Sequence, residues 1–170
     1  MKTIITGLLA ITVMAASAFA GNPDTRANLI SLFSDRHYTA DEEAIKKAGE
    51  DVPGTLKEMA GDESLLTFIR MRAVNALGFF SNEDVGEFLQ ATASSSVTRV
   101  GIRSEAITAL SNSQGDKSTK FIAGFLKDSD TLMRSSAANS LRRVGSPSAK
   151  AALRQVGGDD GGASTLKPLD

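Results

Sequence analysis

Few residues of this 170-residue chain have the type and spacing that catalysis requires. The chain has no Cys and a single His, so it offers neither a His/Cys metal cluster nor a Cys/His or Ser/His/Asp nucleophilic set. His37 lies in the stretch DRHYT with no orienting partner beside it, and we interpret it as a turn residue. We therefore predict a non-enzymatic protein with no catalytic residue, no metal ligand and no cofactor.

Two acidic groups are the remaining candidates for cation chemistry, DEE at 41–43 and GGDDGG at 157–162. Calcium needs alternating oxygen ligands in a closed loop with a defined turn. Neither stretch has that spacing. We interpret the first as a solvated helix start and the second as part of a solvated tail.

Three arginines share one surrounding sequence and are candidates for anion binding. The three copies are RMRAVNAL (70–77), RSEAITAL (103–110) and RSSAANSL (134–141). Arg70, Arg103 and Arg134 are separated by 33 and then 31 residues, a period typical of two-helix repeats. Because Arg suits a fixed hydrogen-bonding role, we interpret these three residues as structural positions between repeats.

Each copy places apolar and small residues on one side of a predicted helix, at spacings of three and four. They are Ile69, Ala73, Ala76, Leu77 and Phe80 in the first copy, Ile102, Ala106, Ala109 and Leu110 in the second, and Met133, Ala137, Ser140 and Leu141 in the third. Since small side chains let helices approach closely, we expect this side to stack against neighbouring helices.

An apolar helical segment precedes each copy. These segments are GTLKEMA behind Pro53, NEDVGEFLQATA at 82–93 and DKSTKFIAGFLK at 116–127. Turn signals separate them, and no alternating run predicts a strand. The sequence therefore predicts one helix pair after another.

An apolar first helix followed by a second helix with this pattern of Arg, Ala and Ala-Leu resembles a HEAT-type repeat in its short bacterial form. The resemblance covers about residues 52–156, with three full repeats and a partial fourth in PSAKAALRQV (147–156). It implies an all-α, right-handed α-solenoid of antiparallel helix pairs.

The resemblance also implies an Asp–Arg ladder, in which an Asp of the turn lies six residues before the Arg. Asp128 and Arg134 fit that spacing. Asp62 lies eight residues before Arg70, and three serines (94–96) occupy the turn before Arg103. We therefore expect an incomplete ladder.

The N-terminus has the features of a signal peptide over residues 1–20. Lys2 precedes an apolar run, and AFA at 18–20 is a small-x-small cleavage pattern before Gly21. We predict cleavage after Ala20, a periplasmic or secreted location and no stable membrane insertion afterwards. An uncleaved membrane anchor is the alternative, but the apolar run is short for a bilayer span.

The two ends of the remaining chain differ from the repeats. Residues 21–51 are predicted to be a helical cap on the first repeat, and Thr39 with Glu42 forms a capping-box pattern within them. Residues 157–170 are rich in Gly and polar residues and predict a flexible tail.

Charge is unevenly distributed along the chain. Residues 21–98 have a net charge of −6 and residues 99–156 a net charge of +6. In a solenoid, order along the sequence is order in space, so this polarity persists in the fold. The near-neutral total and the predicted export disfavour nucleic acid as a partner.

Two surfaces are candidates for protein binding. Asn75, Thr108 and Asn139 occupy equivalent positions on the second helices, about 10 Å apart if those helices pack side by side. The basic second half places Arg142, Arg143, Lys150 and Arg154 close in sequence. Ordinary solvent exposure is the alternative interpretation of both.

We expect an exported scaffold that binds another, unidentified protein. The alternatives are a structural protein that binds copies of itself, acidic end to basic end, and an accessory or chaperone subunit of an enzyme.

Overall fold

The structure is a computed structural model that describes residues 23–156, and over these residues it contains helices and no strand. The elements are α1 (Pro23–Ser34), α2 (Glu42–Lys46), α3 (Val52–Gly61), α4 (Thr67–Ala76), η1 (Leu77–Phe79), α5 (Glu83–Ser94), α6 (Val100–Gln114), η2 (Gly115–Ser118), α7 (Thr119–Ala123), η3 (Gly124–Lys127), α8 (Thr131–Val144) and α9 (Pro147–Val156). The η segments are 3-10 helices. The predicted signal peptide and tail lie outside the described residues.

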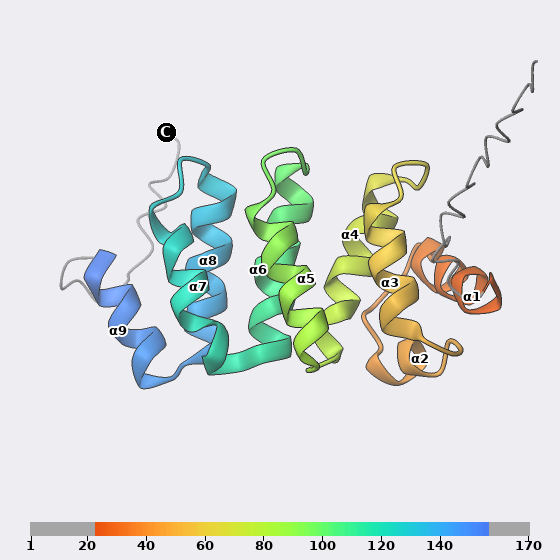
Figure 1. Ribbon diagram of the computed structural model, residues 1–170, viewed down its shortest axis with the longest axis horizontal. Helices are drawn as coiled ribbons and strands as arrows, with labels where there is room; N and C mark the ends of the chain where they lie inside the picture. Colours follow the sequence, from red (N-terminus) through yellow and green to blue (C-terminus); the bar gives the residue numbers. More distant parts are fainter. Residues whose placement is uncertain (1–22, 157–170) are drawn as a thin grey trace, which may run out of the picture.

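Three helix pairs follow one another along the long axis of the molecule (Figure 1). The first repeat pairs α3 with α4, the second pairs α5 with α6, and the third pairs the η2–α7–η3 segment with α8. The central helix α6 packs against its own partner α5 and also against α4 and α8 of the neighbouring repeats. The prediction of an all-α solenoid of helix pairs is confirmed.

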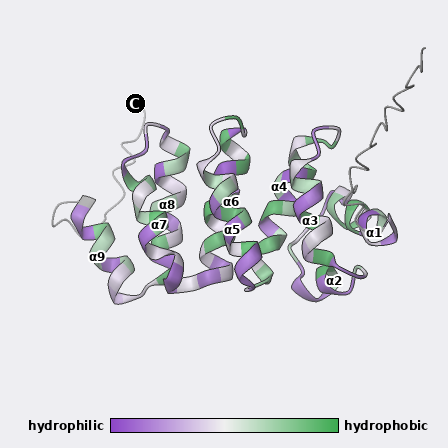
Figure 2. Cartoon of the chain, viewed as in Figure 1, coloured by the Kyte–Doolittle hydropathy of each residue, from purple (hydrophilic) through white to green (hydrophobic). Residues whose placement is uncertain are grey.

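The predicted stacking side of the second helices is the core of the solenoid. Ile69, Ala106 and Leu141 are each at most 4% exposed, and so are their equivalents in the other repeats except Phe80, which is partly buried. Gly78 shows how closely the helices approach, since a Cβ atom there would lie 3.2 Å from the Cα atom of Ala109. Figure 2 shows hydrophobic and hydrophilic residues alternating along the helices, as expected when one side of each is buried.

The first segment of the third repeat differs from the prediction of a single helix over 116–127. It consists of the 3-10 segment η2, five residues of α-helix in α7 and the 3-10 segment η3. Gly115 ends α6 with a φ of 51° and so redirects the chain, and the Ser118 hydroxyl then donates to the Gly115 carbonyl at 2.6 Å. Ile122 and Leu126 still point into the core.

The N-terminal cap also differs in one detail. The capping box predicted at Thr39 and Glu42 is wrong, because α2 begins at Glu42 and the Asp41 carboxylate caps it. Asp41 Oδ1 accepts hydrogen bonds from the backbone N–H groups of Glu43 and Ala44, at 2.9 and 3.1 Å. Asp41 is adjacent to the first helical residue, where a cap must lie.

Candidate functional site

The outward sides of α4, α6 and α8 form what we call the second-helix face, and the predicted polar row lies on it. Asn75 is not free, because its amide donates to the Glu105 carboxylate across the α4–α6 contact at 3.1 Å. Asn139 is exposed, and its amide oxygen accepts from Arg142 at 2.9 Å. Thr108 lies between them on α6 and is half-buried. The three residues are therefore spread over three helices, with two of them already hydrogen-bonded.

A groove of about 330 Å³ opens on the second-helix face, between α4 and α6. We call it the α4–α6 groove, and its lining is Tyr38, Phe68, Met71, Arg72, Asn75 and Glu105. Phe68 is 45% exposed, whereas the inward-facing residues of α4, such as Ile69 and Ala73, are buried. The groove thus combines an accessible aromatic ring with the Asn75–Glu105 pair.

Arg72 fixes one wall of the α4–α6 groove. Its guanidinium donates to the backbone carbonyls of Phe33 and Asp35 and so fastens the N-terminal cap to α4. The same group lies 4.4 Å from the centre of the Tyr38 ring and 5.2 Å from that of Phe68, as in a cation–π contact.

Tyr38 contributes a buried polar atom to this region. Its hydroxyl has no hydrogen-bond partner among the described residues. Burial raises the pKa of the Tyr38 hydroxyl, and the charge of Arg72 opposes that rise, so the phenol is neutral at physiological pH. It can donate a hydrogen bond to a group that enters beside it.

We did not predict four of the residues that line the groove, Tyr38, Phe68, Met71 and Arg72. Phe68 carries the only local signal, since a large aromatic residue stands on the polar side of a predicted amphipathic helix. The other three are brought together by the cap, which contacts α4 from 39 residues earlier in the chain, at Phe33. No local spacing indicates such a contact.

The three repeat arginines form hydrogen bonds within their own repeats. Arg70 and Arg103 each donate through Nε to the carbonyl at the end of their own first helix, Ala60 and Ala93, at 3.0 Å. Arg134 donates to the carbonyls of Asp128 and Ser129, both at 2.8 Å.

The Asp–Arg ladder runs between repeats. The Asp128 carboxylate lies 4.0 Å from Arg103 of the preceding repeat. Arg134 of the same repeat contacts the backbone carbonyl of Asp128 and not its carboxylate. Asp62 pairs with Arg26 of α1, although its spacing from Arg70 departs from the family pattern. Of the three turns, the turn of the second repeat, with its serines at 94–96, is therefore the one that interrupts the ladder.

The basic residues of the second half lie at the C-terminal end of the described solenoid. Arg142 and Arg143 end α8, and Lys150 and Arg154 are exposed on α9. Arg143 Nη2 lies 3.4 Å from the hydroxyls of Ser111 and Ser140. Cations in the last turn of α8 also interact favourably with its helix dipole.

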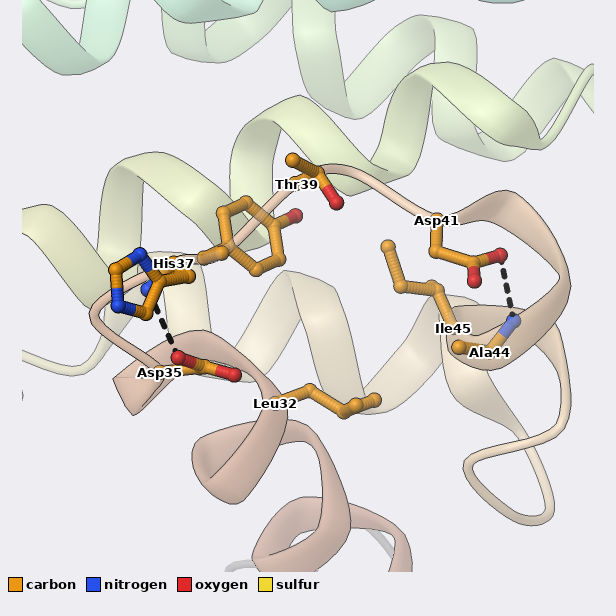
Figure 3. Close-up of a pocket in the computed structure, with 8 residues that line it drawn as sticks. Leu32, Asp35, His37, Thr39, Asp41, Ala44 and Ile45 are labelled. Atoms are coloured by element: carbon orange, nitrogen blue, oxygen red, sulfur yellow. Dashed lines mark hydrogen bonds between the residues drawn. The ribbon is translucent and has the colours of Figure 1, made fainter.

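A smaller pocket of about 120 Å³ lies in the N-terminal cap and includes His37 (Figure 3). His37 is exposed, and its backbone N–H donates to the Asp35 carboxylate at 2.8 Å. Asp41 lies at the other end of the pocket, engaged in capping α2. The geometry brings no acid–base pair together there. Across residues 23–156, no group of three or more His, Cys, Asp or Glu side chains is placed to hold a metal ion.

A profile of the family described as HEAT repeats matches residues 99–164. The matched segment has the sequence pattern of HEAT repeats. It begins at the start of α6 and includes the third repeat and α9, and the same helix-pair geometry with its Arg position recurs before it, in α3 and α4. No curated protein matches the chain.

HEAT repeats generally serve as protein-interaction scaffolds. In the described part of the chain, no helix combines the length and the apolar content needed to cross a bilayer. A protein partner is the class of ligand that this architecture indicates.

Proposed function

We propose that the chain is an exported, non-enzymatic scaffold that binds another protein through its second-helix face. The α4–α6 groove is the observation that carries this proposal. Phe68 stands 45% exposed at its edge, beside Arg72 and the Asn75–Glu105 pair. Aromatic and Arg side chains are enriched in the parts of interfaces that contribute most to affinity.

Binding is tested by capturing partners from the exported fraction of the source cells with immobilised protein. We expect Phe68→Ser and Thr108→Arg to weaken capture of the same partner by more than about fivefold, the effect of losing 1 kcal/mol at an interface. Gln90→Arg is the matched control, because Gln90 is exposed on the first helix α5. Equal loss in the control, with all variants folded, would exclude the second-helix face.

Asn75 is left unchanged in this experiment. Its amide bonds to Glu105 across the contact between two repeats, so its substitution would alter the packing of α4 on α6 as well as the surface. Turnover of a hydrolytic or redox substrate by the purified chain would overturn the non-enzymatic part of the proposal.

Export is supported by the Lys2, apolar-run and AFA pattern of residues 1–20. We expect protein isolated from outside the cytoplasm to begin at Gly21. Intact-mass measurement of that protein checks the cleavage site. Recovery only of cytoplasmic chain that retains residues 1–20 would contradict export.

Self-association is a second candidate function, and the charge distribution favours it. Residues 21–98 have a net charge of −6 and residues 99–156 of +6, and the helices from α1 to α9 follow in sequence order along the molecule (Figure 1). Opposite ends of two copies are therefore complementary. Sedimentation velocity at low and high salt tests this: salt-sensitive oligomers support it, and a monomer at both concentrations excludes it.

A further inference from the structure

One position recurs at the end of the first helical segment in all three repeats. Asp62, Ser95 and Asp128 are the residues that immediately follow α3, α5 and η3. Both aspartates reach back to an arginine of the preceding unit, Asp62 to Arg26 and Asp128 to Arg103. The solenoid therefore places a carboxylate in front of the preceding arginine wherever this position is acidic.

The second repeat has Ser95 at this position, and the arginine that corresponds to it is Arg70. The two arginines are equivalent in geometry, because Arg70 and Arg103 donate through Nε to matching carbonyls at the same distance, 3.0 Å. Ser95 brings no charge, and its hydroxyl accepts from Thr98. Within residues 23–156, Arg70 makes no ion pair, and its side chain donates only to Ala60.

A pocket of about 330 Å³ lies at Arg70, and we call it the Arg70 pocket. A second cation, Arg99, lines it and stands at the start of α6. No side chain caps that helix, so its N-terminal dipole adds positive potential. Glu63 also lines the pocket but is exposed and pairs with neither arginine.

The Arg70 pocket also has apolar side chains in its mainly polar lining. Phe88 and Val97 contribute to the lining, and Val97 is 94% exposed in the turn between α5 and α6. A ligand that combined a carboxylate with an adjacent apolar group would contact both parts. An acidic side chain of a polypeptide beside an apolar residue has this chemistry.

We propose that the Arg70 pocket binds an acidic side chain of a protein partner, which supplies in trans the carboxylate that Asp128 supplies in cis to Arg103. The guanidinium groups of Arg70 and Arg99 hold the carboxylate, and Val97 contacts its apolar neighbour. The proposal rests on the proposed function in one respect, that the partner is a protein, but it concerns the turn side of the repeats and not the α4–α6 groove.

The test follows the arginine Nε–Hε signals of the full chain by NMR during titration with the peptide acetyl-Asp-Val-amide. We expect a saturable shift of the Arg70 signal and none of Arg103, whose partner is already present. The peptide acetyl-Asn-Val-amide, which lacks the charge, should bind about tenfold more weakly, the effect of losing one charged contact of about 1.4 kcal/mol.

Three variants sharpen the test. Ser95→Asp fills the site in cis and should abolish the Arg70 shift, whereas Ser96→Asp adds the same charge at a neighbouring exposed residue and should leave most of it. Asp128→Ser should make the Arg103 signal respond to the peptide. Equal responses of both arginines in the unaltered chain, or an undiminished Arg70 shift in Ser95→Asp, would overturn the proposal.

Acetate separates the possible sources of the carboxylate. If acetate binds Arg70 as tightly as the peptide does, the pocket takes free carboxylates and the assignment to a protein partner is wrong. This test and the capture experiment can fail separately. If the peptide binds Arg70 but the second-helix-face variants capture the partner normally, the Arg70 pocket is supported and the second-helix face is excluded. If those variants lose capture but the peptide does not bind Arg70, the second-helix face is supported and the Arg70 pocket is excluded.

Discussion

The solenoid has two junctions between repeats, the former between the second and third repeats and the latter between the first and second. They share the same helix packing but differ in their polar contacts. At the former, Asp128 pairs with Arg103, and the hydroxyls of Ser104 and Ser136 lie 2.6 Å apart. At the latter, Ser95 stands where the aspartate would be, and Arg70 is left beside a pocket. The comparison indicates that the apolar core forms the solenoid and that the charged ladder is a separable addition, which leaves a surface where it stops.

Substitution of the shared core should have the largest effect, because both junctions depend on α6. Leu110 is fully buried on this helix. We expect Leu110→Ala to lower the free energy of unfolding by about 2–5 kcal/mol, through lost burial and the cavity left behind. Urea denaturation measures the change, with Lys120→Ala at an exposed residue of α7 as the control. A loss below about 1 kcal/mol would mean that the polar contacts hold the repeats together.

Removing the two equivalent arginines tests the difference between the junctions directly. Arg103→Gln removes the carbonyl contact and leaves Asp128, whose side chain is 20% exposed, without its partner. Arg70→Gln removes the carbonyl contact alone. We expect the first substitution to cost about 1 kcal/mol more in the free energy of unfolding than the second.

Urea denaturation of the two single variants gives that difference. The double variant Arg103→Gln, Asp128→Asn serves as the control, since it removes both charges of the pair. Equal losses in Arg70→Gln and Arg103→Gln would show that the ion pair adds nothing to the junction.

The contact of α9 with the third repeat should give the smallest effect, one that depends on pH. Hydrogen bonds from Ser146, Ser148 and Thr119 lower the pKa of the Asp116 carboxyl. Because the pKa of Asp116 is lower in the folded state, its hydrogen bonds stabilise the fold fully at pH values above the ordinary carboxyl pKa of about 4. That stabilisation is lost as the pH falls through the pKa that Asp116 has in the folded state.

We therefore expect Asp116→Asn to lower Tm slightly at pH 7 and to leave Tm unchanged at a pH below the lowered value. Thermal unfolding of the variant and the unaltered chain at both pH values measures this. Glu87→Gln, at an exposed residue of α5, is the control for a general effect of charge. A Tm difference that persists undiminished in acid would contradict the assignment.

The helix pairs and their buried sides could be predicted from sequence, whereas the candidate sites could not. Ile69, Ala73 and Ala76 recur at spacings of four and three, the helical period of about 3.6 residues, and this period is visible within one segment. The α4–α6 groove depends instead on the contact of Arg72 with the carbonyl of Phe33, 39 residues earlier in the chain. The predicted row of Asn75, Thr108 and Asn139 was placed on the correct helices, but its hydrogen bonds to Glu105 and Arg142 were not foreseen.

The sequence by itself determined the repeat, the helices and the residues that fill the core, because helix periodicity and repeated small residues are local properties. It also showed three serines (94–96) in the turn of the second repeat, where the third repeat has Asp128. Only the tertiary structure decided which arginine each acid reaches, since Asp128 pairs with Arg103 of the preceding repeat and not with Arg134 of its own. The physical reason is that an ion pair forms between groups that packing brings together, and the packing of one repeat on the next is not contained in the spacing within either.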